Sequence, residues 1–442
     1  MTDPREELRK ADELIADVIG EARLDAAEEG TQSIPELAPD AAVVQEALQA
    51  EIRRRRQRPL PKLADPEAPL LVVNDLRTHF KLGDGWVRAV DGVSFTLRDG
   101  EALGIAGESG CGKTTTALSL VRILPDNARI RKGSSIELFG IDLVPKTENQ
   151  LRRYRWREVS IVFQGAMNAL NPVRRIGEQI AEPIEIRLGE PKEAALARAT
   201  ALLELVGIPG KRANAYPHEL SGGMRQRAMI AMALACDPAV VIGDEPTTAL
   251  DVMVQAQILE LLERLRRELG LSLILITHDL SVIAETCDRA LIMYAGRVAE
   301  EGPVSRLFTA PRHPYTQRLL GAFPNIHADR RSLETIPGSP PDLRTPPSGC
   351  RFHPRCPAVM DVCRTVVPLE VRFPDDVRVA CHLHPAGVNG AVPVETPATT
   401  GKKGRIPAGV PVDADGLPIL PLGADGQPVT PAAATSATSV PS

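Results

Sequence analysis

The stretch Gly107-Glu108-Ser109-Gly110-Cys111-Gly112-Lys113-Thr114-Thr115 decides the fold of this chain. It fits G-x-x-x-x-G-K-[ST], the pattern of a phosphate-binding P-loop. An apolar strand is expected before it, at residues 102–106, and a helical pattern follows at residues 115–123. Glycines let consecutive backbone N–H groups turn toward an anion, and the helix N-terminus adds its positive dipole end. Lys113 can reach the β- and γ-phosphates, and the Thr114 hydroxyl can hold Mg²⁺.

Length and composition narrow the class of protein. The chain has 442 residues, too many for one ordinary core, so two or more domains are expected. Its net charge is -5 and its aromatic content 3%, which does not indicate nucleic acid as a partner. The longest apolar runs fall well short of the roughly 20 residues of a membrane span, and the N-terminus lacks the apolar core of a secretory signal. We therefore expect a cytoplasmic protein whose seven cysteines are reduced unless they bind metal.

The order of patterns along the chain indicates its domains. Residues 1–66 are predicted to be a helical or partly disordered extension, with one helix at Pro4–Ala27 and a second that Asp40 could cap. The second helix ends in the run Arg53–Arg56, which we interpret as a solvated helix end in preference to a site for anionic lipid headgroups. From about residue 69 to 325, strands alternate with helices, which predicts an α/β domain with a helical part at about 170–235. Residues 326–385 form a further region, and 386–442 are expected to be disordered.

Two adjacent acids follow an apolar strand at residues 240–242. A carboxylate at a strand end can bind the Mg²⁺ that Thr114 holds, and the next carboxylate can polarise an attacking water. We assign Asp244 to Mg²⁺ and Glu245 to the general base. Alone, the pair could equally be a helix cap after a buried strand.

Four further elements stand at usable spacings. Ser221, Gly222 and Gly223 open a helix within the string Leu220–Arg227, which creates a second anion site from N–H groups and a hydroxyl. Gln164 ends the strand 161–163 and could touch Mg²⁺ or water. His278 follows a strand that ends at Thr277. A lone histidine there is more often structural, and His278 is a candidate γ-phosphate contact only because the other motifs are present. Asp251 follows the acid pair and could also be a simple helix cap.

Together these motifs resemble the nucleotide-binding subunit of ATP-binding cassette (ABC) transporters. The resemblance implies a RecA-like α/β core of the P-loop NTPase class, an antiparallel β subdomain and a helical subdomain that carries the signature at Ser221. It places Gln164 in the Q-loop and Asp251 in the D-loop, and it makes His278 the switch histidine. It also implies that ATP binds between the P-loop of one subunit and the signature of a second ATPase. An aromatic side chain would stack on the adenine, and Phe80 is our candidate for it, with Trp86 as the reserve. The ATP contacts would come from Phe80, Gly107, Ser109, Gly110, Cys111, Gly112, Lys113, Thr114, Thr115, Gln164, Ser221, Gly222, Gly223, Asp244 and Asp251.

Three stretches narrow the resemblance to the peptide-importer branch: 163–172, 216–221 and 313–320. This branch implies an ATPase at the cytoplasmic face of the membrane. Its partners would be two permease subunits, an extracytoplasmic peptide-binding protein and a related ATPase as heterodimer partner. Import of nickel or another small solute is the alternative.

Rivals of a different class are an ABC ATPase of DNA repair or chromosome organisation, a tandem ABC translation factor and a regulatory nucleotide-binding module. The short interval between P-loop and signature, the single cassette and the intact acid pair argue against these.

Four cysteines cluster in a proline-rich C-terminal segment: Cys350, Cys356, Cys363 and Cys381. Thiolates gathered in a loop-rich cytoplasmic segment suggest a metal site, although the spacing C-x5-C-x6-C argues mildly against zinc. Peptide-importer ATPases that this chain resembles carry a similar pattern assigned to a [4Fe–4S] cluster, which is the reading we prefer here. Zinc, with His353, His382 and His384 as reserve ligands, is second, and unligated thiols are the remaining alternative.

Overall fold

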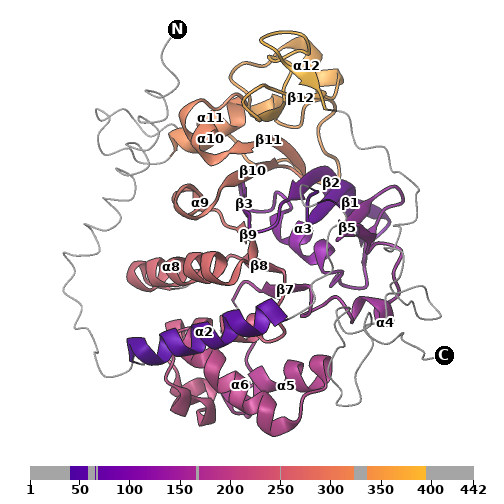
Figure 1. The fold of residues 1–442 in the computed structure, drawn as a ribbon. Helices are drawn as coiled ribbons and strands as arrows, with labels where there is room; N and C mark the ends of the chain where they lie inside the picture. Colours follow the sequence, from indigo (N-terminus) through magenta and orange to yellow (C-terminus); the bar gives the residue numbers. More distant parts are fainter. Residues whose placement is uncertain are drawn as a thin grey trace, which may run out of the picture.

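The structure, a computed structural model, describes residues 40–57, 65, 68–165, 169–248, 250–322 and 336–394. The expected helix at Pro4–Ala27 lies outside these residues. Figure 1 shows a stack of parts. Helices α2 (Ala41–Gln57), α5 (Ile176–Leu188) and α6 (Lys192–Leu205) lie at the bottom, the sheets in the middle, and α12 (Asp361–Thr365) with β12 (Glu370–Arg372) at the top. The P-loop region therefore lies between a helical layer and a C-terminal region.

A nine-stranded sheet forms the centre, in the order β14-β12-β13-β11-β10-β3-β9-β8-β7. Strands β10, β3, β9, β8 and β7 run parallel, and the remaining pairs are antiparallel. Every residue of β3, β8 and β9 is buried, as expected for parallel strands covered on both faces. The strands are β3 (Ala102–Ala106), β7 (Val159–Val162), β8 (Val240–Asp244), β9 (Ser272–Ile276), β10 (Arg289–Tyr294), β11 (Arg297–Pro303), β12 (Glu370–Arg372), β13 (Arg378–Ala380) and β14 (Val392–Pro393).

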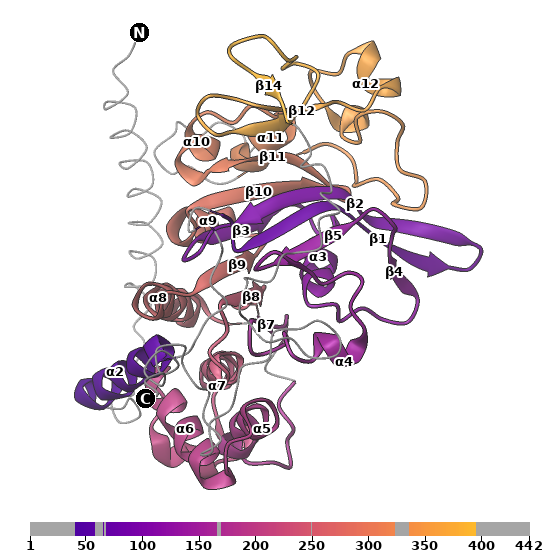
Figure 2. The same ribbon diagram turned by 45° about the vertical axis from the view of Figure 1, so that its right-hand side comes forward.

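An antiparallel sheet packs over the P-loop helix α3 (Lys113–Leu120), as Figure 2 shows. Its main path is β2-β1-β5-β6, and β4 pairs with β1. Apolar residues of both sheets and of α3 share one buried cluster, so this sheet fixes α3 against β3. The strands are β1 (Leu71–Leu82), β2 (Gly85–Leu97), β4 (Ala128–Ile130), β5 (Ser135–Leu138) and β6 (Ile141–Asp142).

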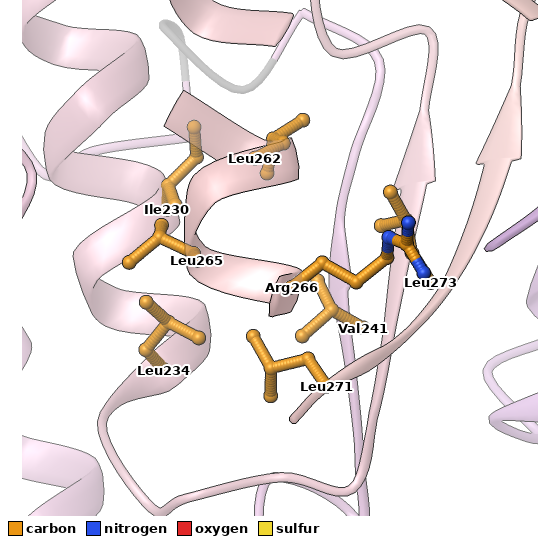
Figure 3. Close-up of a pocket in the computed structure, with 8 residues that line it drawn as sticks. All are labelled: Ile230, Leu234, Val241, Leu262, Leu265, Arg266, Leu271 and Leu273. Atoms are coloured by element: carbon orange, nitrogen blue, oxygen red, sulfur yellow. The ribbon is translucent and has the colours of Figure 1, made fainter. Parts of the chain in front are cut away.

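Helix α8 (Val252–Leu269) covers the parallel sheet with an apolar face. Asp251 caps its first turn, and Gly270 ends it at a φ of 62°. Figure 3 shows the junction that α8 makes with the strands, where Leu262 and Leu265 meet Ile230, Leu234 and Val241. Arg266 lies at the edge of this apolar junction, where it pairs with Glu263 at 2.8 Å. The other helices near the sheets are α4 (Glu148–Leu151), α9 (Leu280–Thr286), α10 (Val304–Thr309) and α11 (Pro314–Gly321).

The helical layer consists of α5 (Ile176–Leu188), α6 (Lys192–Leu205) and α7 (Gly222–Leu234), with the 3₁₀ turns Gly210–Asn214 and Pro217–Glu219 between the last two. It corresponds to the helical part expected at about 170–235. Helix α2 (Ala41–Gln57) lies against this layer and contacts both α6 and α8. As expected, Asp40 caps α2, because its side chain accepts a bond from the Ala42 N–H at 3.0 Å.

The arginine run at the end of α2 is not simply a solvated helix end, and this corrects our interpretation. Arg54 forms ion pairs with Glu190 and Asp237, and Arg55 donates to the Pro238 carbonyl at 2.7 Å. Arg53 and Arg56 are exposed. The run therefore docks α2 onto the loops beside α6 and β8, contacts that no local pattern indicates.

A buried ionic group completes this docking. Arg198 of α6 donates to Asp237 at 2.7 Å and to Glu51 of α2 at 3.2 Å, and all three side chains are at most 9% exposed. Burial raises the pKa of Glu51, and the neighbouring Asp237 raises it further. The Arg198 cation bonds to both buried carboxyl groups, and Arg54 also pairs with Asp237.

Replacing Arg198 with methionine is expected to loosen α2 from the helical layer. Removing one partner of a buried pair leaves uncompensated charge, at a cost of about 3 kcal/mol. Hydrogen exchange of the amides of α2 and α6 measures this local opening. The control is Arg53→Met on the exposed face of α2, expected to change the opening free energy by less than about 0.5 kcal/mol. Equal protection in the two variants would contradict the role of Arg198.

The C-terminal region extends the central sheet instead of forming a separate body. Strand β13 pairs with β11, and Val371, Phe373, Val379, Cys381 and Ala391 form a small core of their own. This region also holds a 3₁₀ turn at His353–Arg355 and helix α12 (Asp361–Thr365). We expected disorder from residue 386 onward, but strand β14 lies within that segment. Ala391, just before β14, is buried in the small core and so anchors the start of the segment. Residues 395–442 lie outside the described part.

Among the residues that the structure describes, none of the helices has both the length and the apolar composition that crossing a membrane requires.

Candidate active site

Four of the parallel strands deliver their carboxyl ends to one edge of the sheet. Strand β3 leads into the P-loop, β8 ends at Asp244, β9 leads to His278, and β7 leads to Gln164. Ligands of open α/β sheets bind at this edge, outside the carboxyl ends of the strands. The topology thus brings together residues that are up to 171 positions apart, from Gly107 to His278 (278 − 107).

Two glycines of the P-loop are packed so closely that any other residue there would force the neighbouring backbone to move. Gly107 has a φ of 145°, and a Cβ there would lie 2.1 Å from the Met293 carbonyl oxygen. Gly112 has a φ of 108°, and its Cβ would lie 2.3 Å from the Ala89 carbonyl oxygen. The loop is therefore pressed between β10 and β2. Cys111 between them is buried, and burial raises the pKa of its thiol, which agrees with a packing role.

Lys113 and Thr114 open helix α3 at the base of this loop. The Lys113 Nζ donates to the carbonyl oxygens of Gly107 at 2.7 Å and Glu108 at 3.2 Å. The Thr114 hydroxyl donates to Asp244 Oδ1 at 3.1 Å, so the two residues assigned to Mg²⁺ lie side by side. Burial raises the pKa of Asp244 to about 6. A buried carboxylate next to a hydroxyl is a hard oxygen donor set that fits Mg²⁺.

Glu245 is the centre of a second cluster. It accepts a hydrogen bond from Gln164 Nε2 at 2.7 Å, and its other oxygen lies 3.3 Å from His278 Nδ1. Thr248, which sequence reasoning missed, donates to it at 3.0 Å. Three candidates from three strand ends therefore meet at one carboxylate, while the His278 side chain remains 65% exposed.

The backbone at Glu245 is in an unusual conformation. Its φ is 48°, which is left-handed and disfavoured for a residue other than glycine. The N–H of Glu245 is held by the Ile276 carbonyl at 2.8 Å, so β9 stabilises the turn. Such outliers often occur where a side chain must be aimed, and here the aimed group is the carboxylate.

Gly243, which precedes the acid pair, proves to be a close-packing position. A Cβ there would lie 3.2 Å from Pro246 Cγ and 3.3 Å from Leu275 Cδ1. The glycine thus lets the Glu245 turn fold back over β9.

The signature residues lie at the start of α7. Ser221 is the N-cap and accepts from the Met224 N–H at 3.3 Å. A Cβ on Gly223 would lie 2.7 Å from Val254 of α8, which places α7 and α8 in close contact. Asp251 accepts from the Val254 N–H at 2.9 Å, so within this chain it acts as a helix cap.

The two adenine-stacking candidates lie on the β1–β2 hairpin. Phe80 is half-buried and pairs with Val87, two residues before the Ala89 that contacts the P-loop. Trp86 has one ring face occupied by the guanidinium of Arg131, 5.1 Å from its centroid. Along the paired strands, Phe80 is therefore closer than Trp86 to the residue that contacts the P-loop, and Phe80 remains the preferred candidate.

The iron–sulfur or zinc centre predicted at the four C-terminal cysteines is not supported by the described residues. Nowhere in the described residues do three His, Cys, Asp or Glu side chains converge to hold a metal ion. Cys381 packs in the small C-terminal core, and burial raises the pKa of its thiol to about 12. The ring nitrogens of the reserve ligands lie against carbonyl oxygens, His353 at 2.9 Å, His382 at 2.8 Å and His384 at 3.0 Å. The seven cysteines, all within the described part, form no disulfide.

Comparison with known proteins agrees with this geometry. A family model described as "ABC transporter" matches residues 90–248, and one described as "Oligopeptide/dipeptide transporter, C-terminal region" matches residues 299–363. A probable peptide ABC transporter ATP-binding protein of Sinorhizobium fredii is 47% identical over 322 residues, which cover 72% of this chain and 96% of that protein. The chain belongs to the ABC transporter family. It carries the oligopeptide/dipeptide C-terminal region of that family as well as the ATP-binding cassette.

Two further relatives of this ABC protein are oligopeptide transport ATP-binding proteins OppD. The Salmonella typhimurium protein is 48% identical over 72% of this chain and 94% of its own length. The Escherichia coli protein is 48% identical over 71% of this chain and 92% of its own length. Among solved structures, the dimer of a bacterial ABC transporter cassette aligns at a TM-score of 0.48 and 27% identity, over 53% of this chain and 98% of that one.

Replacing Gly112 with alanine is expected to weaken ATP binding by at least about tenfold. The new methyl group would collide with the Ala89 carbonyl, and moving the loop costs more than the roughly 1.4 kcal/mol that a tenfold change represents. The control is Gly140→Ala, because Gly140 lies outside the P-loop and also has a positive φ, 74°, but no atom within 4 Å of the new methyl. Titration with a fluorescent ATP analogue compares them, and equal affinities would contradict this account of the loop.

Proposed function

We propose that this chain binds and hydrolyses ATP to power an ABC importer of di- and oligopeptides. The observation that carries the proposal is the match to peptide-transport ATP-binding proteins over more than nine-tenths of their length. The match to the oligopeptide/dipeptide C-terminal region supports the same substrate class. Nickel or another small solute is the alternative cargo.

The geometry supports a role for each residue of the site. Glu245 takes a proton from a water whose oxygen attacks the γ-phosphorus, the bond to the β,γ-bridging oxygen breaks, and ADP and phosphate are released. His278, beside Glu245, contacts the γ-phosphate, and Lys113 neutralises charge on the β- and γ-phosphates. Mg²⁺, when bound, withdraws charge from the phosphate oxygens, and Thr114, Asp244 and Gln164 would hold it.

The remaining ATP contacts come from two sources. In this chain, the P-loop backbone from Gly107 to Thr115 surrounds the phosphates, and Phe80 stacks on adenine. Ser221, Gly222, Gly223 and Asp251 serve the site of a second, related ATPase subunit. Within this chain Ser221 and Asp251 cap α7 and α8. Two subunits arranged head to tail would then close on two ATP molecules, and hydrolysis would reopen them.

The proposed assembly has three further kinds of partner. Two transmembrane permease subunits bind the ATPase at the cytoplasmic face of the membrane, and an extracytoplasmic protein delivers the peptide. The proposed division of the chain is an N-terminal extension at 1–66, a nucleotide-binding domain at 69–325 and a C-terminal region from 326. The C-terminal region continues past the predicted boundary at 385, because Ala391 packs in its core.

Affinity purification of the native complex tests this assembly. Recovery of permease subunits and a related ATPase supports the proposal. Recovery of ribosomes or DNA instead of permeases would place the chain in a non-transport class and overturn it.

A further inference from the structure

A partly buried ion pair joins the P-loop to the C-terminal region. Its two residues, Glu108 and Arg355, are 247 positions apart in the sequence. Arg355 Nη1 donates to Glu108 Oε2 at 2.6 Å, and Arg355 Nη2 donates to Glu108 Oε1 at 2.9 Å. The Arg355 side chain is 6% exposed and that of Glu108 22% exposed. Two parallel bonds between a guanidinium and a carboxylate fix both distance and orientation.

Arg355 is itself held in place by the C-terminal region. Its Nε donates to the Pro337 carbonyl at 2.8 Å and its Nη2 to the Gly338 carbonyl at 3.3 Å. Its Nη1 also donates to the Tyr294 hydroxyl at 3.2 Å, at the end of β10. The guanidinium therefore presents a fixed fork to Glu108, which the single ammonium group of a lysine could not reproduce.

Glu108 is held from a second side by Tyr315 of α11. The N–H of Glu108 donates to the Tyr315 hydroxyl at 2.9 Å. The Tyr315 ring packs against Tyr294 and Phe352, with centroid distances of 4.7 and 5.3 Å. The carbonyl of Glu108 also accepts a bond from Lys113, so the conformation of Glu108 contributes, with the Gly107 carbonyl, to the position of the phosphate-binding lysine.

A second arginine of the same segment reaches the other flank of the loop. Arg351 donates to the Ala295 carbonyl and forms a buried ion pair with Asp91. The N–H of Asp91 donates to the Gly296 carbonyl at 2.8 Å, and the N–H of Gly296 donates to the Cys111 carbonyl at 2.8 Å. The turn Cys350–Cys356 thus contacts the P-loop through Arg355 and supports it through Arg351.

We propose that the turn Cys350–Cys356 is a positioning clamp for the P-loop, in which Arg355 and Tyr315 hold Glu108 in the conformation that binds nucleotide phosphates. The proposal rests on the ATP site proposed above. It adds that the C-terminal region controls how tightly that site binds ATP. Coupling of two sites is reciprocal. ATP binding therefore stabilises the docked turn to the same extent as the docked turn strengthens ATP binding.

The test measures ATP affinity of the full chain with Arg355→Gln, Glu108→Gln and both together. Each single variant is expected to weaken ATP binding by about tenfold, the size of a lost charge-assisted hydrogen bond. The double variant is expected to bind no more weakly than either single one, because both remove the same link. The control is Arg344→Gln, which removes an exposed ion pair with Asp342 in the same region and should leave affinity unchanged.

Two more measurements separate positioning from a general loss of structure. Hydrogen exchange at residues 350–356 should slow on addition of ATP in the wild type and not in Arg355→Gln. Tyr315→Phe keeps the buried ring but removes the acceptor of the Glu108 N–H, so it should weaken ATP binding several-fold without unfolding the chain. In each responsive variant KM for ATP should rise more than kcat falls.

The outcomes distinguish this inference from the proposed function. A wild-type chain that does not bind ATP would overturn the proposed function itself. A wild type that binds ATP, together with Arg355→Gln and Tyr315→Phe variants of unchanged affinity, would overturn the clamp alone. Additive losses in the double variant would also reject it, since the two side chains would then act independently.

Discussion

Glu245→Gln is expected to bind ATP with wild-type affinity and to hydrolyse it about 100 to 10,000 times more slowly, the range that a general base contributes. Glutamine keeps the size of the side chain and an oxygen that can accept the bonds from Gln164 and Thr248. It lacks the basic carboxylate that takes a proton from water. ATP binding by titration and phosphate release with partner subunits present separate the two effects.

The control for this variant is Glu268→Gln, on the exposed face of α8, which should hydrolyse ATP at the wild-type rate. Wild-type turnover by Glu245→Gln would overturn the assignment of the base. A simultaneous loss of ATP binding would also count against it, because the effect would then be one of positioning.

Lys113→Ala is expected to weaken ATP binding by about 100-fold, as loss of a charge buried against phosphate costs about 3 kcal/mol. Lys113 is 6% exposed, and its ammonium lies within hydrogen-bond distance of two P-loop carbonyl groups. Alanine keeps the first turn of α3, so the fold should persist. Equilibrium binding of an ATP analogue measures the loss.

Lys132→Ala, at an exposed turn between β4 and β5, is the matched control and should bind ATP normally. If Lys113→Ala bound ATP as tightly as this control, the P-loop assignment would fail. Circular dichroism of both variants shows whether the fold is retained.

Local patterns predicted the P-loop and its surroundings because each depends on neighbouring residues. The strand expected at 102–106 is β3, and the helix after the loop begins at Lys113. Caps such as Asp40 and Ser221 also follow local rules, since their side chains bond to N–H groups two or three residues ahead. The resemblance assigned Gln164, Glu245 and His278 to the ATP site, but their meeting at the Glu245 carboxylate is seen only in the structure.

Contacts between distant segments could not be predicted in this way. Arg355 and Glu108 are ordinary charged residues in their local contexts, and only the docking of the C-terminal region makes them partners. The same holds for Arg54 of α2, whose carboxylate partners lie beside α6 and β8. The cysteine spacing predicted a metal site that the described residues do not support, since no three His, Cys, Asp or Glu side chains among them are placed to hold a metal ion.

Transport by the reconstituted importer tests the central claim most directly. Vesicles containing this chain, its partner ATPase, the permeases and the peptide-binding protein would be supplied with ATP and a labelled oligopeptide. We predict ATP-dependent peptide uptake that unlabelled peptides inhibit, that nickel does not inhibit, and that Glu245→Gln abolishes. Uptake that proceeds unchanged with Glu245→Gln, or that responds to nickel and not to peptides, would contradict the account.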